Sequence, residues 1–150
     1  MMFLPQRPYL PSVPLRAAPA YPAPAGRFTD GEMFSALSRG GLERLTGSLD
    51  ERMRWSRDLS LDEQQSLAFA RLLLHKPRWA LIDDALSALE PKARKSLMSV
   101  FDQELAGSAV ISTGRPASEN GFYGRTLHLR RCPRGAQGAP TSAARLLEVV

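Results

Sequence analysis

The chain lacks the features that place a protein in an oxidising compartment or across a membrane. Its 150 residues include one cysteine, Cys132, so an intrachain disulfide is excluded and no disulfide partner is expected. No apolar run approaches the ~20 residues that span a bilayer. The opening MMFLPQRPYLP has neither the charged nor the apolar region of a signal peptide. We therefore expect any membrane link to come through a partner or through chain outside these residues.

The composition is that of one ordinary globular domain, with 43% hydrophobic and 23% charged residues. A net charge of +5 permits binding to nucleic acid or to an anionic membrane surface. However, the basic residues are scattered, and no basic stripe interleaved with aromatic residues is present, so a solvated surface is the favoured interpretation. The nucleic-acid alternative rests on Arg115, Arg125, Arg130, Arg131 and Arg134.

Residues 1–26 form a first, proline-rich segment. It holds seven of the twelve prolines of the chain: Pro5, Pro8, Pro11, Pro14, Pro19, Pro22 and Pro24. Proline removes an amide donor and fixes φ, which predicts neither regular helix nor central strand here. Residues 1–4 can end a strand, and the rest is predicted as an extended surface loop or a flexible tail.

Residues 27–76 are predicted to form a helical subdomain. Its first helix starts at a Thr29-Asp30 cap and closes at Gly40-Gly41. A short turn over 42–45 and a polar loop over 47–58 follow.

A second helix is predicted from about Asp62 to His75. Ser60 is its N-cap, with Glu63 at the spacing of a capping box. Apolar residues lie nearly all round this helix, so we expect it to be buried in a larger assembly.

Residues 77–130 are predicted as an α/β core. Trp79-Ala80-Leu81-Ile82 shows no polar alternation, which is typical of a strand in the middle of a parallel sheet that helices cover. A helix from Pro91 to Gly107 and a second buried strand over 109–112 follow. A strand near the sheet edge is expected over 125–130.

Residues 131–150 form a C-terminal tail, which is predicted as a linker over 131–142 and as a short strand or helix over 143–150.

The acid pair Asp83-Asp84 directly follows the apolar strand. The carboxyl end of a buried strand is where an α/β sheet holds a metal ion and a catalytic base. The structural alternative is a strand-end turn or a helix cap.

Five short stretches occur in a telling order: FLPQRPYLP, LSLDEQQ, WALIDD, SALE and ISTGRP. With them, residues 3 to about 129 resemble the second half of an ATP-binding cassette (ABC) domain. The resemblance is to the cassette fused to a membrane domain in bacterial transporters of the peptide, vitamin B12 or fatty-acyl type. It implies an α/β fold, a partial P-loop NTPase-like cassette with a mostly parallel sheet core and a helical signature subdomain.

The resemblance also implies binding roles for the cofactors ATP and Mg²⁺. Asp83 and Gln6 would hold the metal, and Gln6 would also sense the γ-phosphate. Ser60, Asp62 and Gln64 lie in the signature motif and would meet ATP held by a second cassette. A helix N-terminus suits phosphate, although a simple N-cap is the alternative role for Ser60.

The same resemblance implies catalytic roles for two residues. Asp84 stands in place of the family's glutamate base, and Arg115 stands in place of its switch histidine. Aspartate is one methylene shorter than glutamate, and arginine cannot accept a proton. Asp62 replaces a glycine that normally approaches phosphate. The sequence has no GxxxxGK[ST] loop, and Ser66 replaces a usual basic residue.

These departures predict a cassette portion of a transporter ATPase that is degenerate and without hydrolysis as an isolated chain. Its partners would be a membrane domain and a second cassette, at the cytoplasmic face of the membrane, and otherwise the chain would be cytoplasmic. A non-catalytic cassette partner is the alternative. A fragment, a mis-assigned start and a degenerate gene each explain the missing P-loop.

Overall fold

The structure, a computed structural model, describes residues 1–86, 89–113, 124, 127–128 and 148–149. The chain divides into two compact units, Met1–Arg115 and Pro116–Val150. In the second unit, β4 (Leu127–His128) pairs antiparallel with β5 (Glu148–Val149). These strands confirm a strand within 125–130 and decide for strand at 148–149. The predicted linker over 131–142 lies outside the described residues.

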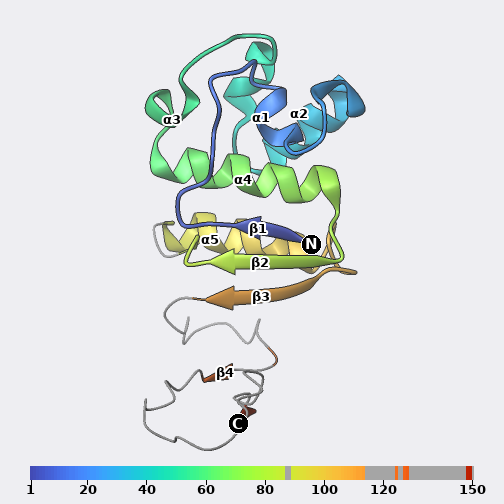
Figure 1. Ribbon diagram of the computed structural model, residues 1–150, viewed down its shortest axis with the longest axis vertical. Coiled ribbons are helices and arrows are strands. Elements are labelled where there is room, and N and C mark those ends of the chain that lie inside the picture. Colours follow the sequence, from blue (N-terminus) through green and yellow to red (C-terminus); the bar gives the residue numbers. More distant parts are fainter. Residues whose placement is uncertain (87–88, 114–123, 125–126, 129–147, 150) are drawn as a thin grey trace, which may run out of the picture. The chain divides into compact units, whose positions relative to one another are not determined.

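The first unit is built on a parallel sheet in the order β1-β2-β3 (Figure 1). Its strands are β1 (Met2–Leu4), β2 (Trp79–Asp83) and β3 (Ala109–Thr113). Each pair of neighbours is parallel, with Leu4 opposite Ile82 and Asp83 opposite Thr113. The carboxyl ends of all three strands therefore meet at one edge of the sheet, and the prediction of β2 as a middle strand is confirmed.

The crossover from β2 to β3 contains α5 (Pro91–Met98) and the 3₁₀ turn η3 (Ser99–Phe101). Proline stands at the start of α5, as predicted, because the first turn needs no amide donor. The predicted extent to Gly107 is wrong, since the chain leaves the α-helix at Ser99. The packing survives this change, because Phe101 and Leu105 remain buried.

The central helix is α4 (Leu61–His75), which lies along the sheet. The capping box of Ser60 and Glu63 begins it, as predicted, and Lys76 ends it in the left-handed region at φ 42°. One side of α4 packs toward the sheet, where the rings of Phe69 and Phe101 lie 6.4 Å apart edge to face. Its other side contacts α1 and α2, which explains apolar residues all round the helix.

The helical part on the far side of α4 includes α2 (Asp30–Arg39), whose capping box joins Thr29 and Glu32. The 3₁₀ turn η2 (Glu43–Ser48) follows. The predicted loop over 47–58 is partly wrong, because it contains α3 (Trp55–Asp58). Trp55 is buried there and its Nε1 donates to the backbone oxygen of Val13 at 2.8 Å, which anchors the polar stretch.

The proline-rich segment is also more ordered than predicted. It contains a short helix, α1 (Ala17–Ala20), and a 3₁₀ turn, η1 (Ala25–Arg27). Leu10, Leu15 and Ala18 are buried, so a surface loop or a flexible tail is the wrong description. The segment packs against α4, which supplies the donors that the prolines lack.

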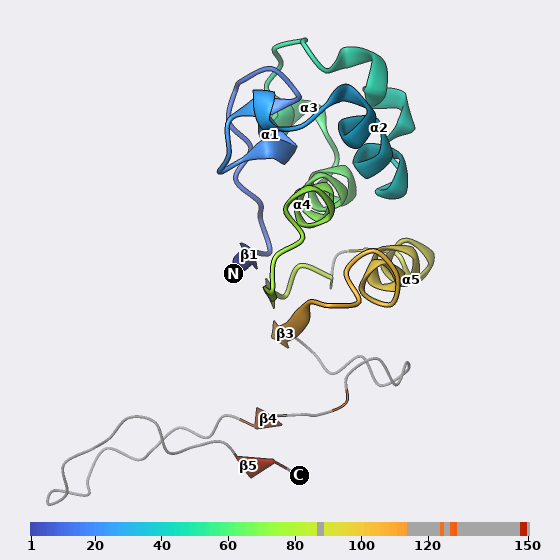
Figure 2. The ribbon, with the colours of Figure 1, turned by 90° about the vertical axis from the view of Figure 1, so that its right-hand side faces the viewer.

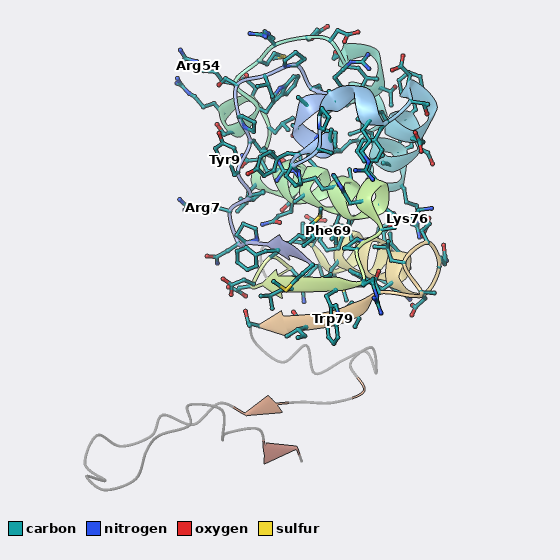
Figure 3. All side chains as sticks on the ribbon, turned by 45° about the vertical axis from the view of Figure 1, so that its right-hand side comes forward. Arg7, Tyr9, Arg54, Phe69, Lys76 and Trp79 are labelled. Carbon is teal, nitrogen blue, oxygen red and sulfur yellow. The ribbon has the colours of Figure 1, made fainter. Side chains whose placement is uncertain are left out.

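The sheet is covered on one face only within the described residues. Figure 2 shows α4 and α5 on the same side of the three strands. Ala80 and Ile82 are buried on that side, whereas Trp79 is 51% exposed on the other (Figure 3). On the same face, Phe3 at 51% and Ile111 at 46% flank Leu81, two residues further along β2. The predictions of β2 covered by helices on both faces and of β3 as buried are therefore wrong for these residues. Exposed aromatic and aliphatic side chains therefore form part of this face.

Candidate functional site

The carboxyl edge of the sheet brings together predicted site residues from distant parts of the chain. Gln6 follows β1, and its Nε2 donates to Oδ2 of Asp84 at 3.0 Å. Asp83 ends β2, and its Oδ1 accepts a hydrogen bond of 2.5 Å from Oγ1 of Thr113 at the end of β3. The parallel register makes this meeting necessary, since the three strands end side by side.

Asp84 turns the chain away from the sheet. Its φ of 49° lies in the left-handed region, which aspartate tolerates better than most residues. Its backbone amide donates to the backbone oxygen of Thr113 at 3.1 Å. The carboxylate is thus aimed back toward Gln6 by a fixed turn rather than by a flexible loop.

The start of α4 holds the other predicted nucleotide-binding residues. Oγ of Ser60 accepts from the amide of Glu63 at 3.2 Å, and the Glu63 carboxylate accepts from the amide of Ser60 at 2.9 Å. Ser60 is exposed and Asp62 is half-buried. Nε2 of Gln64 donates to the backbone oxygens of Leu59 at 2.9 Å and Ser56 at 3.2 Å, so this side chain closes the turn before the helix.

Glu63 is also the residue of this helix end that forms an ion pair and has a lowered pKa. Its carboxylate accepts from the guanidinium of Arg44, and this hydrogen bond is the largest cause that holds the pKa of Glu63 below its usual range. The backbone amide of Ser60 lowers the pKa further. An ionised acid in the first turn favours the helix, because the helix N-terminus is partly positive.

Gln65 connects the two groups of residues. It is fully buried in α4, and its Nε2 donates to the backbone oxygens of Pro5 and Gln6. The start of α4 therefore lies at the same end of the unit as the carboxyl edge of the sheet (Figure 1). Sequence reasoning missed Gln65 and Thr113 as site residues. Thr113 could have been found from the parallel pairing of two strands that end in IDD and IST.

Arg115, the remaining predicted catalytic residue, lies outside the described residues, as do the other arginines of the nucleic-acid alternative. Where the structure is described, no helix is long and apolar enough to cross a membrane. That part of the chain also contains no group of three or more His, Cys, Asp or Glu side chains that could hold a metal ion.

Mg²⁺ with ATP fits the carboxyl edge in part. Asp83 and Gln6 offer oxygen atoms, which this hard cation prefers. Mg²⁺ is commonly held by one or two carboxylates together with the phosphates of its nucleotide, so a single Asp83 suits it better than a closed protein cage. The sequence has no GxxxxGK[ST] loop, so Asp83 and Gln6 would hold the metal without a phosphate-binding loop from this chain.

Comparisons with known proteins agree on one kind of relative, although no family model matches the chain. An uncharacterised ABC transporter ATP-binding protein of Haemophilus influenzae is 36% identical over 129 residues, which is 86% of this chain and 22% of that protein. The lysosomal cobalamin transporter ABCD4 of Mus musculus is 34% identical, over 86% of this chain and 23% of that protein.

A solved structure of a bacterial Atm1-family ABC exporter with ATP bound has a similar fold. Its TM-score is 0.62 at 24% identity, and the match covers 73% of this chain and 20% of the exporter. The chain therefore spans about a fifth of the length of each relative.

Proposed function

Because the chain is homologous to ABC transporter ATP-binding proteins and has the fold of part of an ABC cassette, we propose that it serves as a portion of such a cassette. In that role it contributes to ATP binding and hydrolysis coupled to transmembrane transport. The meeting of Gln6, Asp83 and Asp84 at one sheet edge is the observation that carries the proposal. Gln6 and Asp84 are 78 residues apart in sequence, so only the fold brings them together.

Each side chain at the edge then has a task. Asp83 offers its carboxylate to Mg²⁺, and Thr113 fixes one of its oxygens. Mg²⁺, when bound with ATP, supplies positive charge to the phosphates. Asp84 is the carboxylate that would act as a base toward water, and the hydrogen bond from Gln6 orients it. Arg115 neutralises phosphate without taking up a proton.

The signature residues at the start of α4 act on a different nucleotide in this proposal. Ser60 is exposed at the helix N-terminus, where its hydroxyl and the first amides can meet a phosphate held by a second cassette. Asp62 and Glu63 bring negative charge to the same turn and weaken that contact. We therefore infer a site in which the chain contributes ligands but does little hydrolysis alone.

Three partners follow from this role: a membrane domain, a second cassette, and a phosphate-binding cassette segment that covers the open face of Phe3, Trp79 and Ile111. The assembly would sit at the cytoplasmic face of a membrane. Support for a cover comes from the exposed apolar side chains themselves, whose burial stabilises by about 25 cal/mol per Å².

The isolated chain tests the inactive state. Purified protein is expected to show no Mg²⁺-dependent ATP hydrolysis above a buffer control, because no phosphate-binding loop is present. Robust hydrolysis that disappears in Asp83→Asn would overturn this part of the proposal and make the chain an ATPase by itself.

A second candidate, a non-catalytic partner of an intact cassette, is favoured by the ordered and exposed start of α4. Pull-down against an intact ABC cassette, with and without Mg²⁺·ATP, tests this candidate. Binding that requires ATP supports donation of Ser60 to the partner's nucleotide, whereas no binding in either state excludes it.

A further inference from the structure

Helix α4 holds the proline-rich segment by side-chain donors. Nε of Arg71 donates to the backbone oxygen of Ala18 at 2.7 Å, and its Nη2 donates to that of Tyr9 at 2.5 Å. His75 bonds the oxygen of Ala20 through Nε2 at 2.7 Å. The segment needs such donors, because its prolines lack amides and its carbonyls cannot join a regular backbone ladder.

Gln65 makes the attachment that lies nearest the candidate site. Its buried Nε2 faces the carbonyl oxygens of Pro5 and Gln6, so the amide group must point its nitrogen toward them. Within the described part of the chain, Oε1 of Gln65 is buried without a hydrogen-bond partner. A buried acceptor without a partner lowers stability, so an apolar residue of the same shape at position 65 would stabilise the core more than glutamine does.

The bond from Gln65 fixes the backbone of Gln6 next to the point where its side chain meets Asp84. One peptide group of Gln6 is held to α4, and Nε2 of the same residue reaches Asp84 at 3.0 Å. Figure 3 shows the next residues, Arg7 and Tyr9, on the chain that rises from β1 past the start of α4. A shift of this backbone would therefore move Gln6 away from the carboxyl edge.

We propose that Gln65 is a positioning residue that sets Gln6 against Asp84 and thereby couples the signature helix to the carboxyl edge of the sheet. This inference rests on the proposed function, in which Gln6 and Asp84 act on the nucleotide. A movement of α4, such as one caused by docking of a second cassette, would then be passed to Gln6 through the side-chain amide of Gln65.

The test follows the side-chain amide of Gln6 by NMR in the full chain without nucleotide. Gln65→Met keeps the shape and removes the donor, and Gln64→Met is the matched control, since Gln64 bonds only Ser56 and Leu59 among the contacts described. We expect Gln65→Met to move the Gln6 side-chain signals toward those of a free amide. Their hydrogen exchange should quicken about tenfold, the equivalent of one lost hydrogen bond.

Several outcomes decide the matter. Displaced Gln6 signals in Gln65→Met, with Gln64→Met unchanged and the melting temperature of Gln65→Met maintained, support positioning. Unchanged Gln6 signals in a folded Gln65→Met overturn it. If Gln65→Met does not fold, the wild-type chain decides, because a scalar coupling across the bond from Gln65 Nε2 to the Gln6 carbonyl must be present. Its absence overturns the inference. Failure of ATP-dependent association would instead count against the proposed function alone.

Discussion

Ser60 offers a way to separate a structural role from a phosphate-binding role at one atom. Its Oγ accepts from the amide of Glu63, and the reciprocal bond closes the capping box of α4. Ser60→Ala removes the acceptor, whereas Ser60→Asp keeps it, because aspartate caps helices as well as serine does. Ser60→Ala should therefore be less stable than Ser60→Asp, because only the alanine variant lacks the N-cap acceptor.

The magnitude follows from the cap. Loss of an N-cap acceptor costs about 1 kcal/mol, so Ser60→Ala should melt roughly 3–6 °C below wild type for a unit of this size. Ser60→Asp should melt close to wild type, because its carboxylate also meets the positive end of the helix. Thermal unfolding followed by circular dichroism measures both.

Binding should rank the variants differently. In pull-down with an intact cassette and Mg²⁺·ATP, Ser60→Asp should lose association, since the added carboxylate repels the phosphate. Ser60→Ala should retain part of it through the helix amides. An Asp variant that binds like wild type would refute the phosphate role, and an Ala variant as stable as wild type would refute the cap.

Three further predictions concern single side chains. Arg71→Met leaves the carbonyls of Tyr9 and Ala18 without their donor and should lower the free energy of unfolding in urea by about 2–4 kcal/mol. Arg71→Lys should not restore this stability, because lysine lacks the planar fork of arginine, and full rescue by lysine would contradict the prediction. The pKa of Glu63 is lowered in the fold, so the stabilisation from its carboxylate is present above its unfolded pKa and is lost as pH falls through the folded value. The decline in melting temperature between about pH 5 and 3 should therefore be shallower in Glu63→Gln, which keeps the capping box. An unchanged slope would exclude this role. Asp84→Glu lengthens the proposed base and should raise ATP hydrolysis of the assembled cassette by up to about 10²-fold, whereas no gain would show that base length is not limiting.

Elements with strong local signals were predictable from the sequence. The N-cap at Thr29, the capping box at Ser60, the apolar strand before Asp83 and the proline that opens α5 all appear where expected. Each of these signals depends on a few adjacent residues. The order of the five motif stretches carries the family resemblance, which agrees with the comparisons.

Elements that depend on distant contacts were not predictable. Helix α3 forms because Trp55 is buried against the segment of Val13, a contact 42 residues away in sequence. The proline-rich segment is ordered by Arg71 from α4. At the site, the acid pair was evident from the strand end, but the bond between Thr113 and Asp83 required the parallel register of β2 and β3.

The most direct test of the carboxyl edge as a nucleotide-metal site is paramagnetic broadening of the ¹⁵N-labelled chain by excess Mn²⁺·ATP. Mn²⁺ replaces Mg²⁺ at oxygen ligands and broadens signals even of weak sites. We expect selective broadening at Gln6, Asp83 and Asp84, with exposed acids elsewhere, such as Asp50 and Asp102, spared. Asp83→Asn should suppress the effect. Broadening spread evenly over the exposed acids, or unaffected by Asp83→Asn, would contradict the site.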